Sequence, residues 1–131
     1  MKKLLFTFIA LVFLNSCRGD DDLDIGTYVG EWNWVSTTGG INNETTTPAS
    51  TGNTIVLSFT SDKKYTITTN GTVTNEGTYS LYKDISELSH YEATYIDFSN
   101  YPDKMIKNNE NDQLILSDDF NDGYTETYHK K

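Results

Sequence analysis

Residues 54–82 read TIVLSFTSDKKYTITTNGTVTNEGTYSLY, and this stretch decides the fold. It contains three runs in which apolar and polar residues alternate with period two, the pattern of half-buried β-strands. SDKK at 61–64 and Asn70-Gly71 separate the runs and are hairpin turn signals. The stretch therefore predicts three consecutive antiparallel strands, over residues 54–60, 65–69 and 72–82.

The same alternation continues on both sides of this stretch. The 19 threonines and nine tyrosines of the chain suit strands, because β-branched and aromatic side chains pack well on a pleated surface. Short strands joined by tight turns predict an all-β fold, a small up-and-down antiparallel β-barrel of about eight strands, in which closure removes exposed sheet edges. The remaining five strands are expected over residues 28–36, 91–98, 104–107, 113–117 and 124–130.

Length and charge limit the classes of function. The 131 residues allow one domain. A net charge of −9, from 10 basic and 19 acidic residues, argues against a nucleic-acid partner, since binding a phosphate backbone requires an excess of Lys and Arg. The single cysteine excludes an internal disulfide and a cysteine-based zinc site.

Residues 1–16 are expected to be a signal peptide rather than part of the fold. Lys2-Lys3 precede an apolar run of eleven residues, Leu4 to Leu14, which is shorter than the roughly 20 residues that span a bilayer. The run ends in Leu14-Asn15-Ser16-Cys17, which resembles the lipobox of bacterial lipoproteins and implies acylation of Cys17. The alternative is an ordinary secretory signal with an incidental free cysteine.

Residues 17–27 are expected to form the lipidated cysteine and an acidic tether, with residues 28–131 as the barrel domain. The acidic run Arg18 to Asp24 resembles the surface-export signal of some Gram-negative lipoproteins; a solvated spacer explains it equally well. The expected location is the cell envelope, as an outer-membrane lipoprotein that is periplasmic or surface-exposed and held by membrane lipid.

Several short motifs fall in an order typical of one family. Gly30-Glu31-Trp32 lies on the first predicted strand. Similar steps follow at Leu57-Ser58-Phe59, Tyr65-Thr66-Ile67, Gly77-Thr78-Tyr79, Leu114-Ile115-Leu116 and Asp122-Gly123-Tyr124, with Tyr128 after them. Over roughly residues 26–131 the chain thus resembles the small lipocalin-like domain lipoproteins of bacteria, whose first strand carries a Gly-x-Trp motif. The resemblance implies that Gly30 and Trp32 close one barrel end and that Lys130 lies across the Trp32 ring, where arginine is the usual residue.

Neither catalysis nor a cofactor is expected. His90 and His129 are not placed beside a nucleophile turn, and the chain has no glycine-rich phosphate loop. Asp118, Asp119 and Asp122 crowd one turn and carry the oxygen ligands that suit Ca²⁺. An Asx-rich hairpin turn that bonds its own backbone is the favoured interpretation, so no metal is assigned.

Two functions remain open. In the first, the protein is a monomeric, non-catalytic binding module whose barrel holds a small apolar or amphipathic ligand, because an eight-stranded barrel has room for one. In the second, side chains fill the barrel, and its loops and exposed tyrosines contact an envelope protein or a glycan. The ligand residues in the first hypothesis are Trp34, Tyr79, Tyr124, Glu126 and Tyr128; the exposed tyrosines in the second are Tyr82, Tyr91, Tyr95 and Tyr101.

Two segments bear on this choice. Glu126 shares a face with Tyr124 and Tyr128, so it is either a charge inside the barrel, paired with a lysine or a tyrosine hydroxyl, or a surface residue. The sequence slightly favours the surface position. Residues 37–53 are expected to be a long polar loop without regular structure. It is either a functional loop (a contact loop, or the lid over the barrel mouth that the resemblance to lipocalins implies) or a mobile connection.

Overall fold

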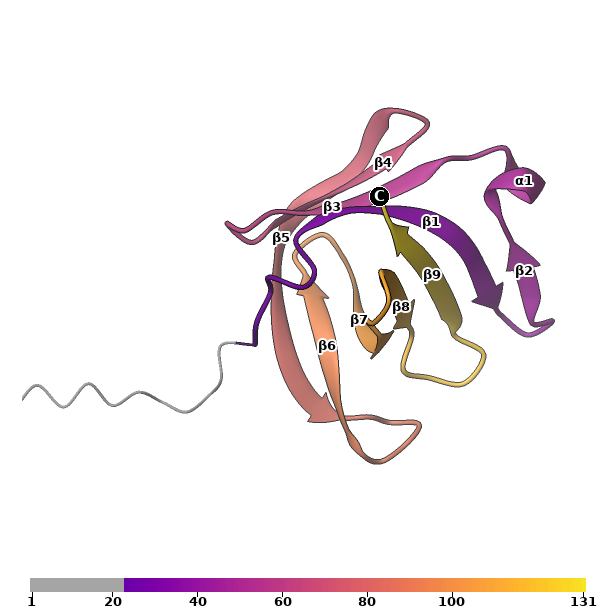
Figure 1. Cartoon of the computed structure of the whole chain (residues 1–131). Coiled ribbons are helices and arrows are strands. Elements are labelled where there is room, and N and C mark those ends of the chain that lie inside the picture. The colour runs from indigo at the N-terminus through magenta and orange to yellow at the C-terminus, as the bar shows by residue number, and fades with distance from the viewer. Residues whose placement is uncertain (1–22) are drawn as a thin grey trace, which may run out of the picture.

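The computed structural model describes residues 23–131, so the expected signal peptide, Cys17 and most of the acidic run lie outside the described residues. Nine strands and one short helix make up the described part (Figure 1). They are β1 (Gly30–Gly39), β2 (Glu44–Thr46), α1 (Pro48–Thr51), β3 (Ile55–Phe59), β4 (Lys64–Thr69), β5 (Thr72–Ile85), β6 (Glu92–Phe98), β7 (Tyr101–Asn108), β8 (Gln113–Ser117) and β9 (Tyr124–Lys130). Over residues 23–131, no helix has the length and hydropathy needed to cross a membrane.

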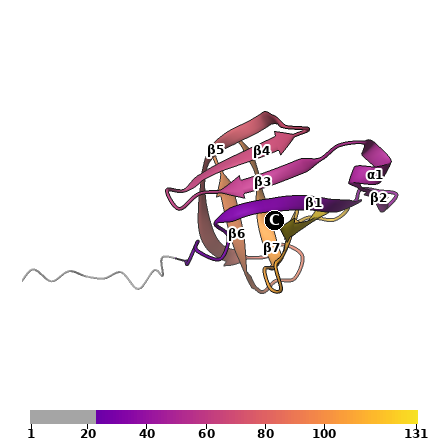
Figure 2. The ribbon, with the colours of Figure 1, turned by 45° about the horizontal axis from the view of Figure 1, so that its top comes forward.

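Eight of the strands form a closed antiparallel barrel, which confirms the predicted fold class. Each strand from β3 to β9 pairs with the next along the chain, β1 pairs with β3, and a β1–β9 pairing closes the ring. In this last pairing Trp34 lies opposite Tyr128. Figures 1 and 2 show the strands curving round a common interior. Closure pairs the two outermost strands with each other, so the barrel avoids the long free edges of an open sheet.

Most predicted strands agree with the structure, but the prediction over residues 104–107 covers only half of β7. That prediction was too short, since β7 begins at Tyr101 and includes Pro102. Proline cannot donate to a strand ladder and is tolerated only at edges and irregularities. Here the β6–β7 register shifts between Ile96 and Phe98, opposite the proline, so its missing N–H is accommodated.

Residues 37–53 are not an irregular loop, so that expectation was wrong. β1 continues to Gly39 and pairs with β2, with Thr37 opposite Thr46. Thr47 then caps α1: its hydroxyl accepts from the Ser50 backbone N–H and its own N–H donates to the Ser50 hydroxyl. Pro48 opens the helix and Gly52, in the left-handed conformation, ends it. These local signals order the segment beside the barrel.

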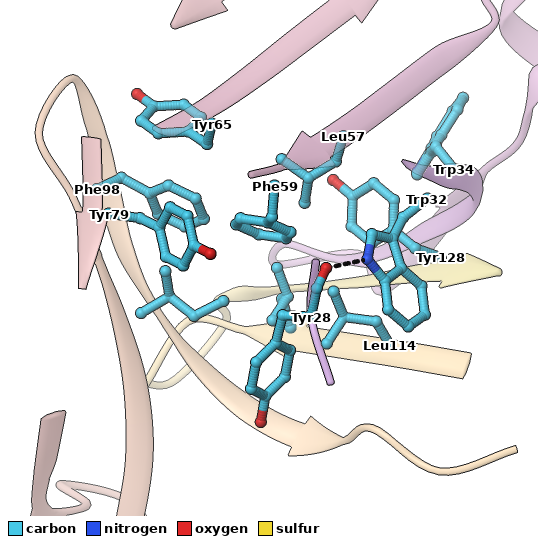
Figure 3. Close-up of a cluster of buried hydrophobic side chains, with 12 residues drawn as sticks. Tyr28, Trp32, Trp34, Leu57, Phe59, Tyr65, Tyr79, Phe98, Leu114 and Tyr128 are labelled. Carbon is cyan, nitrogen blue, oxygen red and sulfur yellow. Dashed lines mark hydrogen bonds between the residues drawn. The ribbon is translucent and has the colours of Figure 1, made fainter. Parts of the chain in front are cut away.

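Aromatic and aliphatic side chains from both halves of the chain pack inside the barrel (Figure 3). Phe59 meets Tyr79 edge to face, with ring centroids 4.7 Å apart, and Tyr65 meets Phe98 in the same way at 4.7 Å. Such pairs add stability beyond the area they bury. The most deeply buried large side chains are Trp32, Leu57, Tyr65, Ile96, Leu114 and Leu116.

Candidate functional site

The first predicted site consists of Gly30, Trp32 and Lys130, and the structure adds Tyr28 to it. We call these four residues the Trp32 region. The Trp32 side chain is 1% exposed, and its indole Nε1–H donates to the Tyr28 carbonyl oxygen at 2.8 Å (Figure 3). Lys130 Nζ lies 5.2 Å from the centroid of the Trp32 ring, within cation–π range. Gly30 has φ +130°, and a Cβ there would lie 3.3 Å from Lys130 Cε. Glycine therefore leaves room for the lysine to cross the indole.

Glu126 lies inside the barrel, so the surface position favoured by the sequence was wrong. It is opposite Leu116 on β8 and is 8% exposed. Both carboxylate oxygens are occupied: Tyr101 OH donates to Oε1 at 3.1 Å, and Tyr128 OH donates to Oε2 at 3.1 Å. The cost of removing this carboxylate from water is offset by the two hydrogen bonds and by a nearby cation.

The cation is Lys104, which the sequence analysis did not assign to any site. Lys104 is 5% exposed; its Nζ lies 2.6 Å from Asp118 Oδ1 and 3.5 Å from Glu126 Oε1. It faces inward because it pairs with Ile96, a core residue with no exposed surface. One sequence signal indicated this orientation. Lys104 is two residues before Ile106, which is partly buried against the core, and residues two apart on a strand share a face. We call Tyr101, Lys104, Asp118, Glu126 and Tyr128 the interior cluster.

The tyrosines of the interior cluster respond to this environment. Burial, and then the charge of Glu126, raise the pKa of Tyr101 well above its ordinary value of 10. The same two causes raise the pKa of Tyr128. Both hydroxyls therefore stay protonated and act as donors to Glu126 over the physiological pH range.

The five residues predicted to bind a ligand separate into two groups. Trp34 Nε1–H donates to Thr37 Oγ1 at 2.8 Å, and Tyr79 OH donates to the Thr60 carbonyl at 2.9 Å. Glu126 and Tyr128 bond to each other within the interior cluster. Tyr124 differs, since its side chain is 50% exposed at the start of β9. Four of the five thus satisfy each other or their neighbours, and one is open to solvent.

The three aspartates considered for calcium do not converge. Asp118 points into the barrel toward Lys104, and its Oδ2 accepts from the Tyr124 backbone N–H at 2.9 Å. Asp119 contacts a different loop, and Asp122 lies exposed with φ 61° in the turn. Across residues 23–131, no group of three or more Asp, Glu, His or Cys side chains is arranged to hold a metal ion.

Asp119 joins two loops that are distant in sequence. Its Oδ1 accepts from Ser86 Oγ at 2.6 Å, and its Oδ2 accepts from Tyr95 OH at 2.7 Å and from the Glu87 backbone N–H at 2.8 Å. The Leu88 backbone N–H adds a longer bond of 3.3 Å to Oδ1. We call this set the Asp119 latch. It ties the β8–β9 loop to the β5–β6 loop.

The latch shifts the pKa values of both acids in it. Burial raises the pKa of Asp119, but the hydrogen bonds from Ser86, Tyr95 and the backbone outweigh burial and lower it to about 2. Burial and the Asp119 carboxylate raise the pKa of Tyr95 to about 12. Sequence reasoning missed the latch because Ser86 and Asp119 are 33 residues apart and no local spacing links them.

Of the four tyrosines expected to be exposed, three are buried or only partly exposed. Tyr95 is 6% exposed and faces away from the barrel interior, since its neighbour Ile96 is in the core. Tyr82 stacks on it, with ring centroids 5.1 Å apart, and is itself only partly exposed. Tyr101 turns inward to the interior cluster, so only Tyr91, at 77% exposure, is fully open.

Exposed apolar side chains gather on three loops. Of the eight large hydrophobic residues exposed within the described part, six belong to the β1–β2, β5–β6 and β8–β9 connections or their flanks. The Asp119 latch joins two of these connections, and a pocket lined by both Ile41 and Tyr124 joins the third. We call these six residues the loop face: Ile41, Ile85, Leu88, Tyr91, Phe120 and Tyr124.

Comparisons of the chain with protein-family models, with curated proteins and with solved structures find no match. The resemblance to lipocalin-like lipoproteins therefore stays a prediction, and the function is argued from the site itself.

Proposed function

We propose that the protein is a non-catalytic, lipid-anchored lipoprotein of the cell envelope whose filled barrel presents the loop face to a protein partner. The gathering of six exposed apolar side chains on three linked loops carries this proposal. Contiguous exposed apolar surface on a soluble domain is typical of interaction sites. Aromatic residues such as Tyr91, Phe120 and Tyr124 are the side chains that interfaces favour.

The state of the barrel interior supports a protein partner over a small ligand. A ligand site usually offers a few polar groups that converge on empty space. Here the polar atoms of Trp34, Tyr79, Glu126 and Tyr128 already bond within the protein. A ligand entering between them would have to break these bonds and replace them.

The position of the loop face suits a tethered protein. The described chain begins on the left in Figures 1 and 2, whereas the β1–β2 hairpin lies on the right in both views. The six residue-to-residue steps from Cys17 to Leu23 span at most about 20 Å when fully extended. An acyl anchor at Cys17 would therefore hold the barrel near the membrane, with the hairpin directed away from the anchored end.

Acylation of Cys17 is tested on the full-length protein expressed in a Gram-negative host. Mass spectrometry of the purified protein should show a mature chain beginning at Cys17 with acyl chains attached. The Cys17→Ser variant should lose this mass and leave the membrane fraction. Wild-type protein that carries no lipid, or a serine variant still held in the membrane, would overturn the anchor.

The loop face is tested by photo-crosslinking in living cells, with the reactive residue placed at Leu88 or Phe120. Val73 is a matched control, since it is 51% exposed on β5 but outside the loop face. We expect a discrete cross-linked protein from the two loop-face positions and none from Val73. The proposal fails if the three positions give the same pattern, or if native mass spectrometry finds a stoichiometric small molecule in the barrel.

A further inference from the structure

We infer that the partner of the loop face is a basic protein surface, and that one of its arginine or lysine side chains enters a pocket beside Tyr124. This inference rests on the proposed function and adds the chemistry of the partner. The pocket has a volume of about 310 Å³ and lies between the β1–β2 hairpin and the β8–β9 loop. We call it the rim pocket; it is lined by Gly39, Gly40, Ile41, Asn42, Glu44, Asp122 and Tyr124.

The charges of the loops point to a cationic partner. Glu44, Asp84, Glu87 and Asp122 are all exposed on the three connections that carry the loop face or on the strand ends beside them. Lys83, on the flank of the β5–β6 connection, already lies 3.7 Å from Glu92. An apolar face bordered by carboxylates attracts basic surfaces, and like charges across such an interface are costly.

The rim pocket concentrates this charge beside an aromatic ring. Two acidic residues, Glu44 and Asp122, are among its lining residues, and the lining contains no Lys, Arg or His. The Tyr124 side chain in the same lining is half exposed. A guanidinium or ammonium group gains from both features, since it lies on an aromatic face and donates to carboxylates. Arginine suits the pocket best, because its planar fork stacks and binds a carboxylate at once.

Two adjacent glycines allow the pocket to form. Gly39 has φ +151°, and a Cβ there would lie 2.3 Å from the Gly123 carbonyl oxygen. Gly40 has φ +77°, and its Cβ would lie 3.1 Å from the Tyr124 hydroxyl. Any larger residue would push the β8–β9 loop away from the hairpin. The glycines thus bring Tyr124 against one wall of the pocket.

The backbone of Tyr124 is also held before a partner arrives. Its N–H donates to Asp118 Oδ2 at 2.9 Å, and its carbonyl accepts from the Asp118 backbone N–H at 2.9 Å. Asp118 is fixed in turn by Lys104. A site that is ordered in the free protein loses less entropy on binding. The interior cluster therefore supports the rim pocket from inside the barrel.

The size of the rim pocket fits one side chain. Pockets for drug-sized molecules span about 300 to 1,000 Å³ and are mostly apolar. The rim pocket is at the lower limit of this range, and its lining includes two acidic residues. A neutral glycan would use the Tyr124 ring but would gain little from two formal negative charges, so we favour the cation.

The experiment measures peptide binding to the full-length acylated protein in neutral detergent, by fluorescence anisotropy. The probes are three short synthetic peptides that interleave leucine with arginine, with citrulline or with glutamate. Citrulline keeps the shape of arginine without its charge. We expect the arginine peptide to bind. The affinity of the citrulline peptide should be lower by at least about tenfold.

Two double variants separate the rim pocket from general charge attraction. Glu44→Gln with Asp122→Asn should weaken the arginine peptide about tenfold. Glu76→Gln with Glu110→Gln makes the same change in net charge at exposed sites outside the three connections. This control pair should change binding by less than about twofold.

Equal losses in the two pairs, equal binding of the arginine and citrulline peptides, or binding of the glutamate peptide as tight as that of the arginine peptide would overturn the inference. If the in-cell cross-links at Leu88 and Phe120 persist in that case, the proposed function stands and only the cationic pocket fails. If neither Leu88 nor Phe120 gives a cross-linked protein in the otherwise unchanged chain, both the proposed function and the cationic pocket fail.

Discussion

The Trp32 region and the loop face are ordered by different forces. In the Trp32 region an indole that is 1% exposed is covered by packing, with Tyr28 accepting its N–H and Lys130 lying over its ring. The loop face leaves its apolar side chains in solvent, and carboxylates hold its loops: Asp118 bonds to Lys104, and Asp119 bonds to the β5–β6 loop. Apolar burial supplies stability without direction, whereas hydrogen-bonded charges fix the position of groups that packing does not cover.

This difference predicts which substitutions destabilise the whole barrel and which release only the loops. Changes in the Trp32 region should lower the free energy of unfolding of the whole barrel. Changes in the Asp119 latch should mainly release the loops, since exposed loops are held by few contacts and open at lower free energy than the core. The interior cluster lies between the two and should show both effects.

The largest effect is expected for Trp32→Ala. Truncating a buried aromatic side chain removes its transfer free energy and leaves a cavity, at a cost of about 3–5 kcal/mol. Urea denaturation should show this loss as a lower midpoint. Val35→Ala, at a neighbouring position that is 37% exposed, is the control and should change little. A Trp32 variant as stable as the wild type would mean that the indole does not close the barrel.

Lys104→Met should cost about 3 kcal/mol, because it leaves Asp118 and Glu126 without their cation inside the barrel. Lys107→Met, at an exposed position on the same strand, should stay within about 0.5 kcal/mol of the wild type. Adding Glu126→Gln to Lys104→Met removes one unpaired charge and should recover part of the loss. A Lys104 variant that behaves like the Lys107 variant would contradict the interior cluster.

Asp119→Asn should remove a pH-dependent part of the stability. The pKa of Asp119 is lowered from 3.8 to about 2 in the folded protein. The stabilisation is therefore fully present above pH 3.8 and is lost as the pH falls toward 2. Asp119 is only partly buried, so solvent screening limits the effect to about 1 kcal/mol.

Thermal melts of the wild type and the Asp119 variant should be compared between pH 3.8 and about pH 2. The two melting temperatures should become equal at the acid end of this range. Hydrogen exchange at neutral pH should become faster in residues 86–91 of the variant, with Asp122→Asn unchanged as a control. Parallel pH profiles and equal exchange in this loop would show that the latch contributes nothing.

The smallest effect is expected for Lys130→Met, which keeps the apolar stem but loses the charge over the Trp32 ring. A cation–π contact at an exposed site contributes about 0.5–1 kcal/mol. Lys130→Arg should match or exceed the wild type, since guanidinium stacks better than ammonium. Chemical denaturation resolves the order of the three proteins, and a methionine variant equal to the wild type would show that the contact is incidental.

Local patterns predicted most of the barrel but little of the loop face. The period-two runs around Trp32, Leu57 and Leu114 placed these side chains in the core, where all three lie. The same alternation could not decide which face of β9 points inward. Glu126 and Tyr128 lie on the same face, and a charge there favours solvent whereas the aromatic ring favours the core. The deciding partner, Lys104, is 22 positions before Glu126 in the printed sequence.

The rim pocket illustrates the same limit. Gly39-Gly40 is visible in the sequence, but nothing local indicates that Gly39 lies under the Gly123 carbonyl. The segment that follows was predicted to be irregular, although the capping signals of Thr47, Pro48 and Gly52 were visible in it. These three residues are enough to predict a short helix from the sequence.

Alternation, turn residues and the lone cysteine thus determined by themselves an antiparallel barrel with an aromatic interior and a predicted lipid anchor. The tertiary structure alone decided that Glu126 is buried on Lys104, that Asp119 joins two loops, and that Ile41 and Tyr124 line one pocket. The physical reason is that hydrophobic period follows from neighbours along the chain. The cost of burying a charge, by contrast, depends on partners that only the closed barrel brings within hydrogen-bond distance.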